Sequence, residues 1–340
     1  MIWLTWRQLR VQAATVVVAV AAVSVVLAVT GPRLAELAKA GVDDVFDKLT
    51  STDISLFWAG LIVVAVVPAL IGAFWGAPMV ARELETGTHR LVWNQSITRT
   101  RWLSTKLAVT TLVAALAVGA LSLAVTWWSD PLDGVVSHTR GGLPELLTPV
   151  SFAMRGVVPV AYTVFAVVLG VTLGAVLRRS LPAMAVTLAL FVAVQVAVPL
   201  WVRPHLVAPT TATFTISGQT LDGISADAKG GPDAITVHTA ERGDWILSNE
   251  TIGPDGRPAT LPSWMSDCLA PSRSGVEGAV PATPVDPCLD RLSSEGYAQR
   301  VVYQPAGNFW PIQLAEAGLY LAVSAVLAGF CIWWTRARLS

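Results

Sequence analysis

The sequence predicts an all-α polytopic membrane protein with six transmembrane helices and a small β-rich, disulfide-containing extracellular domain. Hydrophobic residues make up 54% of the chain and charged residues only 14%. The apolar residues form long unbroken blocks instead of the 3.6- or 2-residue period of a soluble core. One polar stretch, residues 202–309, separates the last of these blocks from the others.

Six apolar blocks reach the length of about 20 residues that a helix needs to cross the hydrocarbon of a bilayer. They are residues 11–30, 56–76, 107–128, 154–177, 181–201 and 311–334. Arg7 and Arg10 before the first block give it some likeness to a secretory signal peptide. Its apolar run is longer than the roughly 7–15 residues of such a signal, so we interpret it as an uncleaved first span.

Two amphipathic segments flank the first span. Residues 1–10 place Trp3 and Trp6 beside Arg7 and Arg10, which predicts a short interfacial elbow helix. Residues 33–49 place apolar side chains at near-helical spacing with acidic residues between them, which predicts an amphipathic helix on the outer surface.

The orientation follows from the Lys and Arg residues of the short loops, since these residues are enriched on the cytoplasmic side. One side of the predicted spans has eleven of them and the other side has five. The side with eleven includes both chain termini. We therefore expect a multi-pass protein of the cell membrane with both termini cytoplasmic and with the first five spans within residues 11–201.

With this orientation residues 202–309 lie outside the cell and form a separate domain. This segment contains twelve acidic and seven basic residues. Its segments 211–217, 235–238 and 300–303 alternate between apolar and polar side chains, with turn residues between them, which predicts a small β-rich fold. Residues 310–340 then form the sixth span and a cytoplasmic tail.

The chain has three cysteines. Cys268 and Cys288 are the two that lie outside a predicted span, and a disulfide between them suits an oxidising compartment. Two unpaired thiols are the alternative. Cys331 lies within the sixth span, where we expect a small apolar packing residue.

The loop between the second and third spans, residues 79–106, is much longer than a simple connection requires. Its charged run contains Glu83, Glu85, Gly87, Thr88, His89, Arg90, Leu91 and Trp93. This run resembles the type 2 family of ABC transporter permeases, which show acidic residues followed by Gly-Thr at this place. The six-span layout and the large external segment between spans five and six are similar to actinobacterial members and to the lipid and multidrug exporters of the G subfamily.

The resemblance implies that this loop is a coupling helix that docks into a separate ATPase subunit. The chemistry of the residues is compatible with docking, because Gly87 can end the helix of span two, and Leu91 and Trp93 offer an apolar anchor. The charged residues around the anchor would form its rim. The alternative is an ordinary solvated loop whose arginines only fix the topology.

No residues for nucleotide chemistry are present in the sequence. It has no G-x-x-x-x-G-K-[ST] phosphate loop, so ATP and Mg are expected only in the partner ATPase, and this chain is not expected to be an enzyme. Its four histidines are scattered and lack metal-ligand spacing. We expect no cofactor or metal in this chain and no nucleic acid partner.

A few polar side chains lie within the predicted spans. Glu316, in the sixth span, needs a partner because an ionised group is costly in the membrane, and Arg155 is the candidate. The pair would serve either as a structural ion pair or in substrate release and gating. Gln195 either makes a hydrogen bond between two helices or lines a cavity. Gly170 and Gly174 form a small-xxx-small pair that permits close helix packing.

These features favour the membrane-spanning permease subunit of an ATP-driven exporter. The resemblance implies a homodimer with two ATPase subunits, and it alone indicates outward transport. Spans rich in Val, Ala and Leu suit a hydrophobic or amphipathic substrate, such as a drug, an antibiotic or a lipid, and contact with membrane lipids. Two alternatives remain: an antimicrobial sensor or immunity protein that binds its ligand through residues 202–309, and a proton-driven secondary transporter that uses Glu316.

Overall fold

A computed structural model describes residues 2–39, 50–88, 98–136, 146–226, 232–238, 243–269 and 286–338. The chain forms two compact units. Unit 1 comprises Met1–Val207 and Phe309–Ser340, and unit 2 comprises Ala208–Asn308. Unit 1 is helical and unit 2 contains the β-strands, so each is described by itself.

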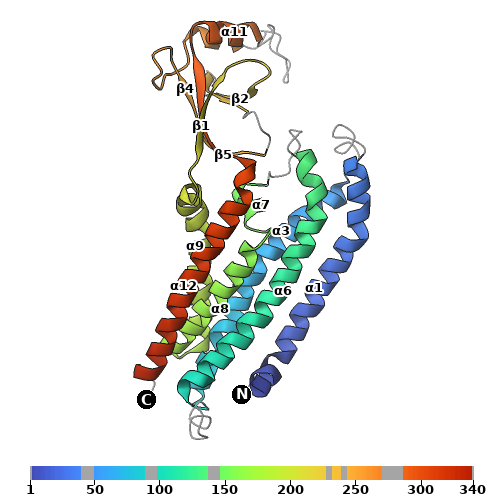
Figure 1. Cartoon of the computed structure of the whole chain (residues 1–340), viewed down its shortest axis with the longest axis vertical. Helices are drawn as coiled ribbons and strands as arrows, with labels where there is room; N and C mark the ends of the chain where they lie inside the picture. The colour runs from blue at the N-terminus through green and yellow to red at the C-terminus, as the bar shows by residue number, and fades with distance from the viewer. Residues whose placement is uncertain are drawn as a thin grey trace. The chain divides into compact units, whose positions relative to one another are not determined.

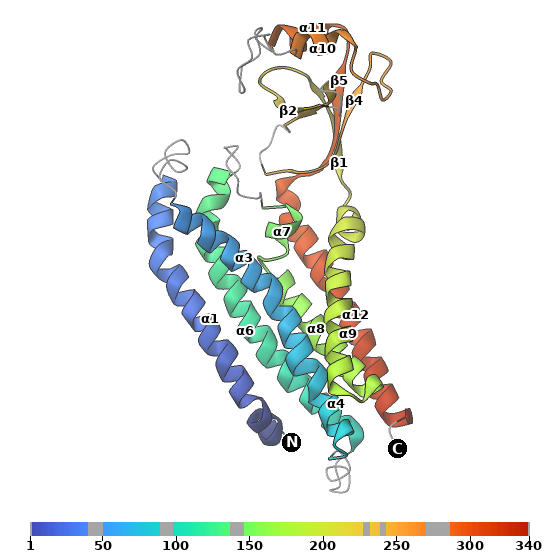
Figure 2. The same ribbon diagram turned by 180° about the vertical axis from the view of Figure 1, so that it is seen from behind.

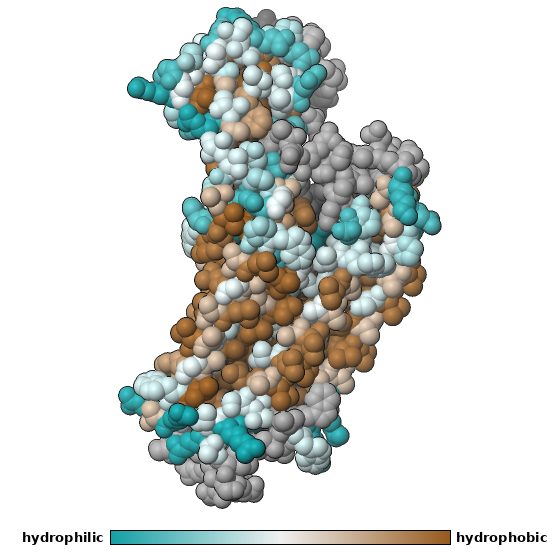
Figure 3. All heavy atoms as spheres, viewed as in Figure 1, coloured by the Kyte–Doolittle hydropathy of each residue, from teal (hydrophilic) through white to brown (hydrophobic). Residues whose placement is uncertain are grey.

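Unit 1 is a bundle of long helices (Figures 1 and 2). Its helices are α1 (Ile2–Lys39), α3 (Ser51–Ile71), η1 (Gly72–Gly76), α4 (Ala77–Glu85), α6 (Arg99–Val136), α7 (Pro149–Phe152), α8 (Val158–Leu177), α9 (Ser180–Ala197), η2 (Val198–Val202), η3 (Arg203–His205) and α12 (Phe309–Arg338). Within the described residues, six helical segments are long and apolar enough to cross a membrane, which confirms the predicted number of spans. Figure 3 shows apolar side chains gathered over the middle of these helices.

Several helices extend beyond the apolar blocks that predict them, whereas α8 begins at Val158, inside its predicted block 154–177. α1 includes residues 2–10 of the predicted elbow and residues 33–39 of the predicted outer helix, since its helix continues through Pro32. The remainder of that outer helix, residues 40–49, lies outside the described residues. α3, η1 and α4 follow one another without a break, and η1 is a π-helical segment.

α8 is the centre of unit 1. It packs against α12, α6, α4, η1, α9 and α3, and both ribbon views place it inside the bundle (Figures 1 and 2). A Cβ atom on Gly72 would lie 2.7 Å from the Ala166 carbonyl oxygen, and one on Gly76 would lie 2.8 Å from the Val167 carbonyl oxygen. Gly170 and Gly174 lie against the backbone of Gly72 and Ala77 from the other side. The expected close packing at this glycine pair is therefore present, between α8 and the η1 region.

The described residues of unit 2 form two small antiparallel sheets. Their strands are β1 (Thr210–Thr215), β2 (Leu221–Ala226), β3 (Pro232–Val237), β4 (Trp245–Ile252) and β5 (Ala298–Gln304), with strand order β1-β5-β4 in one sheet and β2-β3 in the other. The short helices α10 (Trp264–Leu269) and α11 (Asp286–Ser294) complete the unit. Its apolar core brings together strand residues such as Ile235 and Val301 with Met265 of α10 and Leu289 of α11. The prediction of a small β-rich region is thus confirmed.

Candidate functional site

Two groups of polar contacts mark the two ends of unit 1. α4, α8 and α12 finish at one end, where α6 and α9 begin (Figures 1 and 2), and we call this the loop end. The other end, where α3 and α12 begin and α9 finishes, is called the far end. The predicted coupling region belongs to the loop end, and the predicted intramembrane polar residues lie toward the far end.

Gly87 ends the helical segment of α4 at the loop end. Thr86 caps α4, its backbone N–H donating to the Arg82 carbonyl at 3.0 Å and its hydroxyl donating to the same oxygen at 2.8 Å. Gly87 follows in the left-handed region at φ 73°, where a residue with a Cβ is strained. The Thr88 hydroxyl lies 3.1 Å from the Thr86 hydroxyl. The expected helix break at this glycine is therefore present.

Glu83 and Lys106 join the two helices that carry the loop. The Lys106 ammonium of α6 donates to the Glu83 carboxylate of α4. Lys106 is buried, and its ammonium lies 5.0 Å from the centre of the Trp102 ring. A buried ammonium needs such compensation because burial otherwise disfavours its charge. The pair therefore fixes the two ends of the loop next to each other.

Glu85 joins α4 to the start of α9. Its carboxylate accepts from the Ser180 backbone N–H at 3.1 Å and from the Ser180 hydroxyl at 2.8 Å. A carboxylate at the N-terminus of a helix is favourable, because the unpaired N–H groups there carry partial positive charge. Two more links tie in the end of α12: Arg178 donates to the Arg338 carbonyl at 2.9 Å, and Arg336 donates to Thr100 at 2.8 Å.

These contacts add to one expectation. Glu83 and Glu85 were expected in the charged rim of a docking surface, and in this structure both carboxylates bind residues of this chain. Their partners come from α6 and α9, which the linear sequence does not place beside α4. His89, Arg90, Leu91 and Trp93 lie outside the described residues.

The far end contains a fully buried ion pair. Arg203 of η3 donates from Nε to Glu316 Oε2 at 2.7 Å and from a terminal nitrogen to Glu316 Oε1 at 3.0 Å. Tyr162 of α8 donates its hydroxyl to the same carboxylate at 2.5 Å and accepts from Arg203 at 3.2 Å. Such bidentate, charge-assisted contacts are the strongest class of side-chain hydrogen bond. The network joins η3, α8 and α12.

Neighbouring groups complete this network. Arg203 also donates to the Pro149 carbonyl of α7 at 3.2 Å, and its guanidinium lies 4.3 Å from the centre of the Phe152 ring. Tyr320 packs edge-on against Tyr162, with ring centres 4.7 Å apart. The Tyr320 hydroxyl donates to Gln195 of α9 at 2.8 Å. Gln195 therefore makes the helix-to-helix hydrogen bond that was one of its two expected roles.

The expected partner of Glu316 is wrong. Arg155 is buried, and its guanidinium lies 5.5 Å from the centre of the Phe57 ring, while Arg203 holds the carboxylate. Arg203 follows the last apolar residues of the fifth predicted span and was therefore expected in the polar external segment. A signal was present: Arg203 lies within two residues of that span, where a long side chain can turn back toward it.

A second buried polar group holds the start of α8. Gln313 of α12 accepts from the Val157 and Val158 backbone N–H groups, both at 3.1 Å, and donates to the Phe152 and Arg155 carbonyls at 3.0 and 3.1 Å. These amide contacts satisfy backbone groups that the helix start leaves unpaired. Gln313 was not predicted as a site residue, although it lies within a predicted span just as Gln195 does.

The polar contacts at both ends of unit 1 hold helices together. Among the described residues, no cluster of three or more His, Cys, Asp or Glu side chains is placed to bind a metal ion. The far-end network has one acid, and a guanidinium neutralises it. These polar contacts of unit 1 therefore join its helices to one another.

Comparison with known proteins gives one match. The family described as ABC-2 membrane transporter related matches residues 11–203, which is more than half of the chain. The matched region contains α3, α4, α6 and α8 with the loop between α4 and α6, and it ends at Arg203. No curated protein and no solved structure matches the chain.

Proposed function

The chain belongs to the ABC-2 membrane transporter related family, the type 2 ABC transporter permeases, and from this membership we propose that it is the membrane-spanning subunit of an ATP-driven exporter. In this proposal a separate ATPase brings ATP and Mg²⁺, and its closure drives a change of access in the membrane. The chain supplies the transport path and transmits the motion.

One observation carries this proposal: the family match includes the first five membrane-spanning segments and the loop between the second and the third. The family implies a partner ATPase subunit, and we propose that this loop is its docking point. Residues 89–97 would provide the contact itself, with Trp93 as the apolar anchor. Two copies of the chain and two ATPase subunits form the proposed assembly.

The loop end supports this role because its links run to most of the bundle. Glu83 connects the loop base to α6 through Lys106, and Glu85 connects it to α9 through Ser180. A displacement of α4 would therefore move the starts of two other spans. A mobile, unattached loop would lack such a path.

The proposed orientation places both termini and the loop end in the cytoplasm, and unit 2 outside the cell. The excess of Lys and Arg in the loops on one side supports it. Within unit 2 we propose a disulfide between Cys268 and Cys288. Cys288 is buried in the apolar core of that unit, while the Cys268 side chain lies outside the described residues. Such a bond would add stability to a small domain outside the cell.

We propose a hydrophobic or amphipathic substrate. The candidate spans are strongly apolar, and the buried Arg203 and Glu316 of the far end are already paired with each other. Such surfaces suit a drug, an antibiotic or a lipid better than a sugar or an ion.

The decisive experiment is reconstitution of the full chain with the ATPase encoded beside it. Co-purification and stimulation of ATP hydrolysis in liposomes are expected. A complete absence of both would overturn the exporter proposal. A cysteine introduced by Ser96→Cys tests the orientation, because an impermeant thiol reagent added to intact cells should not label it.

The two alternatives gain no specific support. A proton-driven mechanism through Glu316 is disfavoured because protonation would leave the buried Arg203 guanidinium without its counter-charge. Transport that requires only a proton gradient would nevertheless establish the proton-driven mechanism. A sensor that binds its ligand through unit 2 would need no ATPase, so the same reconstitution separates it from the exporter.

A further inference from the structure

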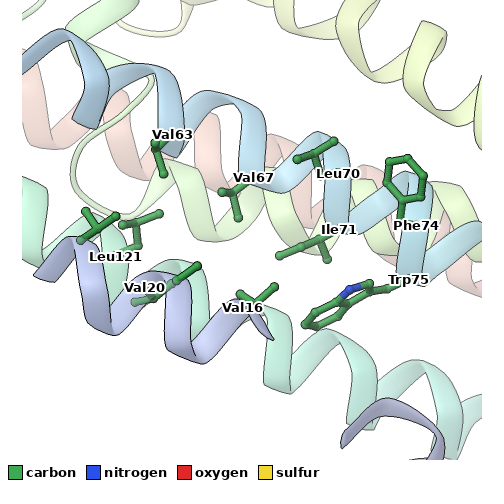
Figure 4. A pocket seen from close by; sticks show the side chains of 11 residues that line it. Val16, Val20, Val63, Val67, Leu70, Ile71, Phe74, Trp75 and Leu121 are labelled. Atoms are coloured by element: carbon green, nitrogen blue, oxygen red, sulfur yellow. The ribbon is translucent and has the colours of Figure 1, made fainter. Parts of the chain in front are cut away.

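An apolar pocket lies between α1 and α3, apart from both polar groups. Its volume is about 160 Å³, and Figure 4 shows the side chains of α1, α3, η1 and α6 around it. Ile71, Trp75 and Leu121 form a buried floor. Leu70 and Phe74 at its edge are 44% and 53% exposed, so the pocket opens onto the lateral surface of the bundle.

The packing of α1 explains why this space is empty of protein. α1 packs mainly along α6, with short side chains on its face toward α3. Val16 packs against the apolar cluster that contains Trp75, and Val20 packs against the cluster that contains Leu121. The pocket lies where these two clusters meet. Val67 of α3 contacts both clusters and lines the opposite wall.

The opposite wall lies directly against α8. Gly72 and Gly76 of η1 lie so near the α8 backbone that a Cβ on either would come within 2.8 Å of a carbonyl oxygen. Phe74 and Trp75 of the same π-helical segment line the pocket. Single π-helical turns inside helices occur frequently at functional sites. The same turn therefore fixes the α8 contact and presents two aromatic rings to the pocket.

The chemistry of the pocket selects one kind of occupant. Pockets for drug-sized molecules are larger, about 300–1,000 Å³, and include a few polar groups that orient the ligand. This pocket is smaller and its lining side chains are apolar apart from the indole of Trp75. Purely apolar cavities of roughly 150 Å³ stay free of water and admit small hydrocarbons. An alkyl segment meets these requirements, and in a bilayer acyl chains reach the lateral opening.

We propose that this pocket binds a segment of one acyl chain of a membrane phospholipid, inserted between α1 and α3. The acyl chain gains no hydrophobic free energy on entering the pocket, because the bilayer interior that it leaves is as apolar as the pocket. It gains dispersion contacts with the lining atoms, which these atoms lack when the space is empty. The site requires only that the helices lie in a bilayer, so it does not depend on the ATPase or on the direction of transport.

The test uses the full chain in phosphatidylcholine liposomes that contain a phospholipid with a diazirine in one acyl chain. After irradiation, mass spectrometry maps the labelled peptides. We expect several-fold more label on residues 70–75 and on the facing part of α1 than on exposed α6 positions such as Leu116 and Leu123. Equal labelling of all exposed faces would overturn the proposal.

A filling variant and its matched control sharpen the result. Val67→Trp puts a large side chain into the pocket, whereas Val66→Trp changes the neighbouring residue, which is 44% exposed and does not line it. We expect several-fold loss of label at residues 70–75 in the first variant alone. Equal loss in both variants, or loss in neither, would overturn the site. Should Val67→Trp fail to fold, Ala19→Leu fills the pocket from α1, with Ala21→Leu as its control.

Discussion

Arg203 and Glu316 are separated by 113 residues in sequence and form a bidentate ion pair without exposed side-chain surface. The chain leaves unit 1 after η3 and returns to it at the start of α12, and this ion pair joins η3 to α12. Tyr162 of α8 contacts both residues, so η3 and α12 are also held to the most buried helix. The ends of the inserted segment 208–308 are therefore fixed by side chains of unit 1 itself.

Removing one partner of this pair should destabilise the protein strongly. Arg203→Met leaves a buried carboxylate without its counter-charge, which costs about 3–5 kcal/mol in comparable buried pairs. The double variant Arg203→Met/Glu316→Leu removes both charges and should recover much of the loss. Unfolding of the purified full chain in detergent, followed by heat and by denaturant, measures these differences.

An exposed ion pair in unit 2 provides the control for these variants of the buried pair. Arg291 and Glu295 pair at 2.9 Å on the surface of α11, and Arg291→Met should cost less than about 1 kcal/mol. If Arg203→Met proved as mild as Arg291→Met, the buried pair would not be a structural clamp. If the double variant were no more stable than Arg203→Met alone, the unpaired Glu316 carboxylate would not be the cause of the lost stability.

Gln313→Leu should loosen the start of α8. The substitution removes four hydrogen bonds and leaves the Val157 and Val158 N–H groups and two carbonyls without this partner. Hydrogen exchange should become faster at residues 152–158. Gln195→Leu removes one hydrogen bond, from the Tyr320 hydroxyl, and should have a much smaller effect. Unchanged exchange at residues 152–158 would contradict the assigned role of Gln313.

Gly170→Val should prevent normal packing of α8. A Cβ at this position would lie 2.8 Å from the backbone nitrogen of Ala77, and backbone cannot rotate away as a flexible side chain can. Gly329→Val on α12 meets no atom within 4 Å and serves as the control in a membrane-spanning helix. Fluorescence-detected size exclusion should show a monodisperse peak for Gly329→Val and its loss for Gly170→Val. Equal profiles would show that α8 tolerates separation from η1.

The membrane-spanning helices could be predicted because each block contains its own signal. A span needs enough apolar residues to cross hydrocarbon, and this is a local property of the chain. Local hydropathy gives the helix ends less well: α6 extends from Arg99 to Val136, well beyond its apolar block at 107–128. Charged and polar residues at these ends stay helical because backbone hydrogen bonds continue past the apolar part.

The polar contacts could be predicted only in part, because they depend on which helices become neighbours. Glu316 was recognised as a residue that needs a cation, but the sequence does not show that Arg203 turns back toward α12. Glu83 and Lys106 were both in the expected coupling region, yet their pairing follows from the antiparallel packing of α4 and α6. The break at Gly87 was predictable, since glycine accepts the left-handed conformation that ends a helix.

The glycine at the loop end gives the sharpest test of docking. Gly87→Pro fixes φ near −65°, which is incompatible with the observed 73°, and removes the N–H that donates to the Leu84 carbonyl. Gly256 in unit 2 is a close match, with φ 72°, open space around its Cα and an N–H that donates to the Gly253 carbonyl. If the loop docks the ATPase, Gly87→Pro should abolish co-purification of that subunit, while Gly256→Pro should preserve it. Because both variants impose the same backbone strain, similar thermal stabilities would assign the difference to the loop, whereas normal co-purification with Gly87→Pro would place the ATPase contact elsewhere on the protein.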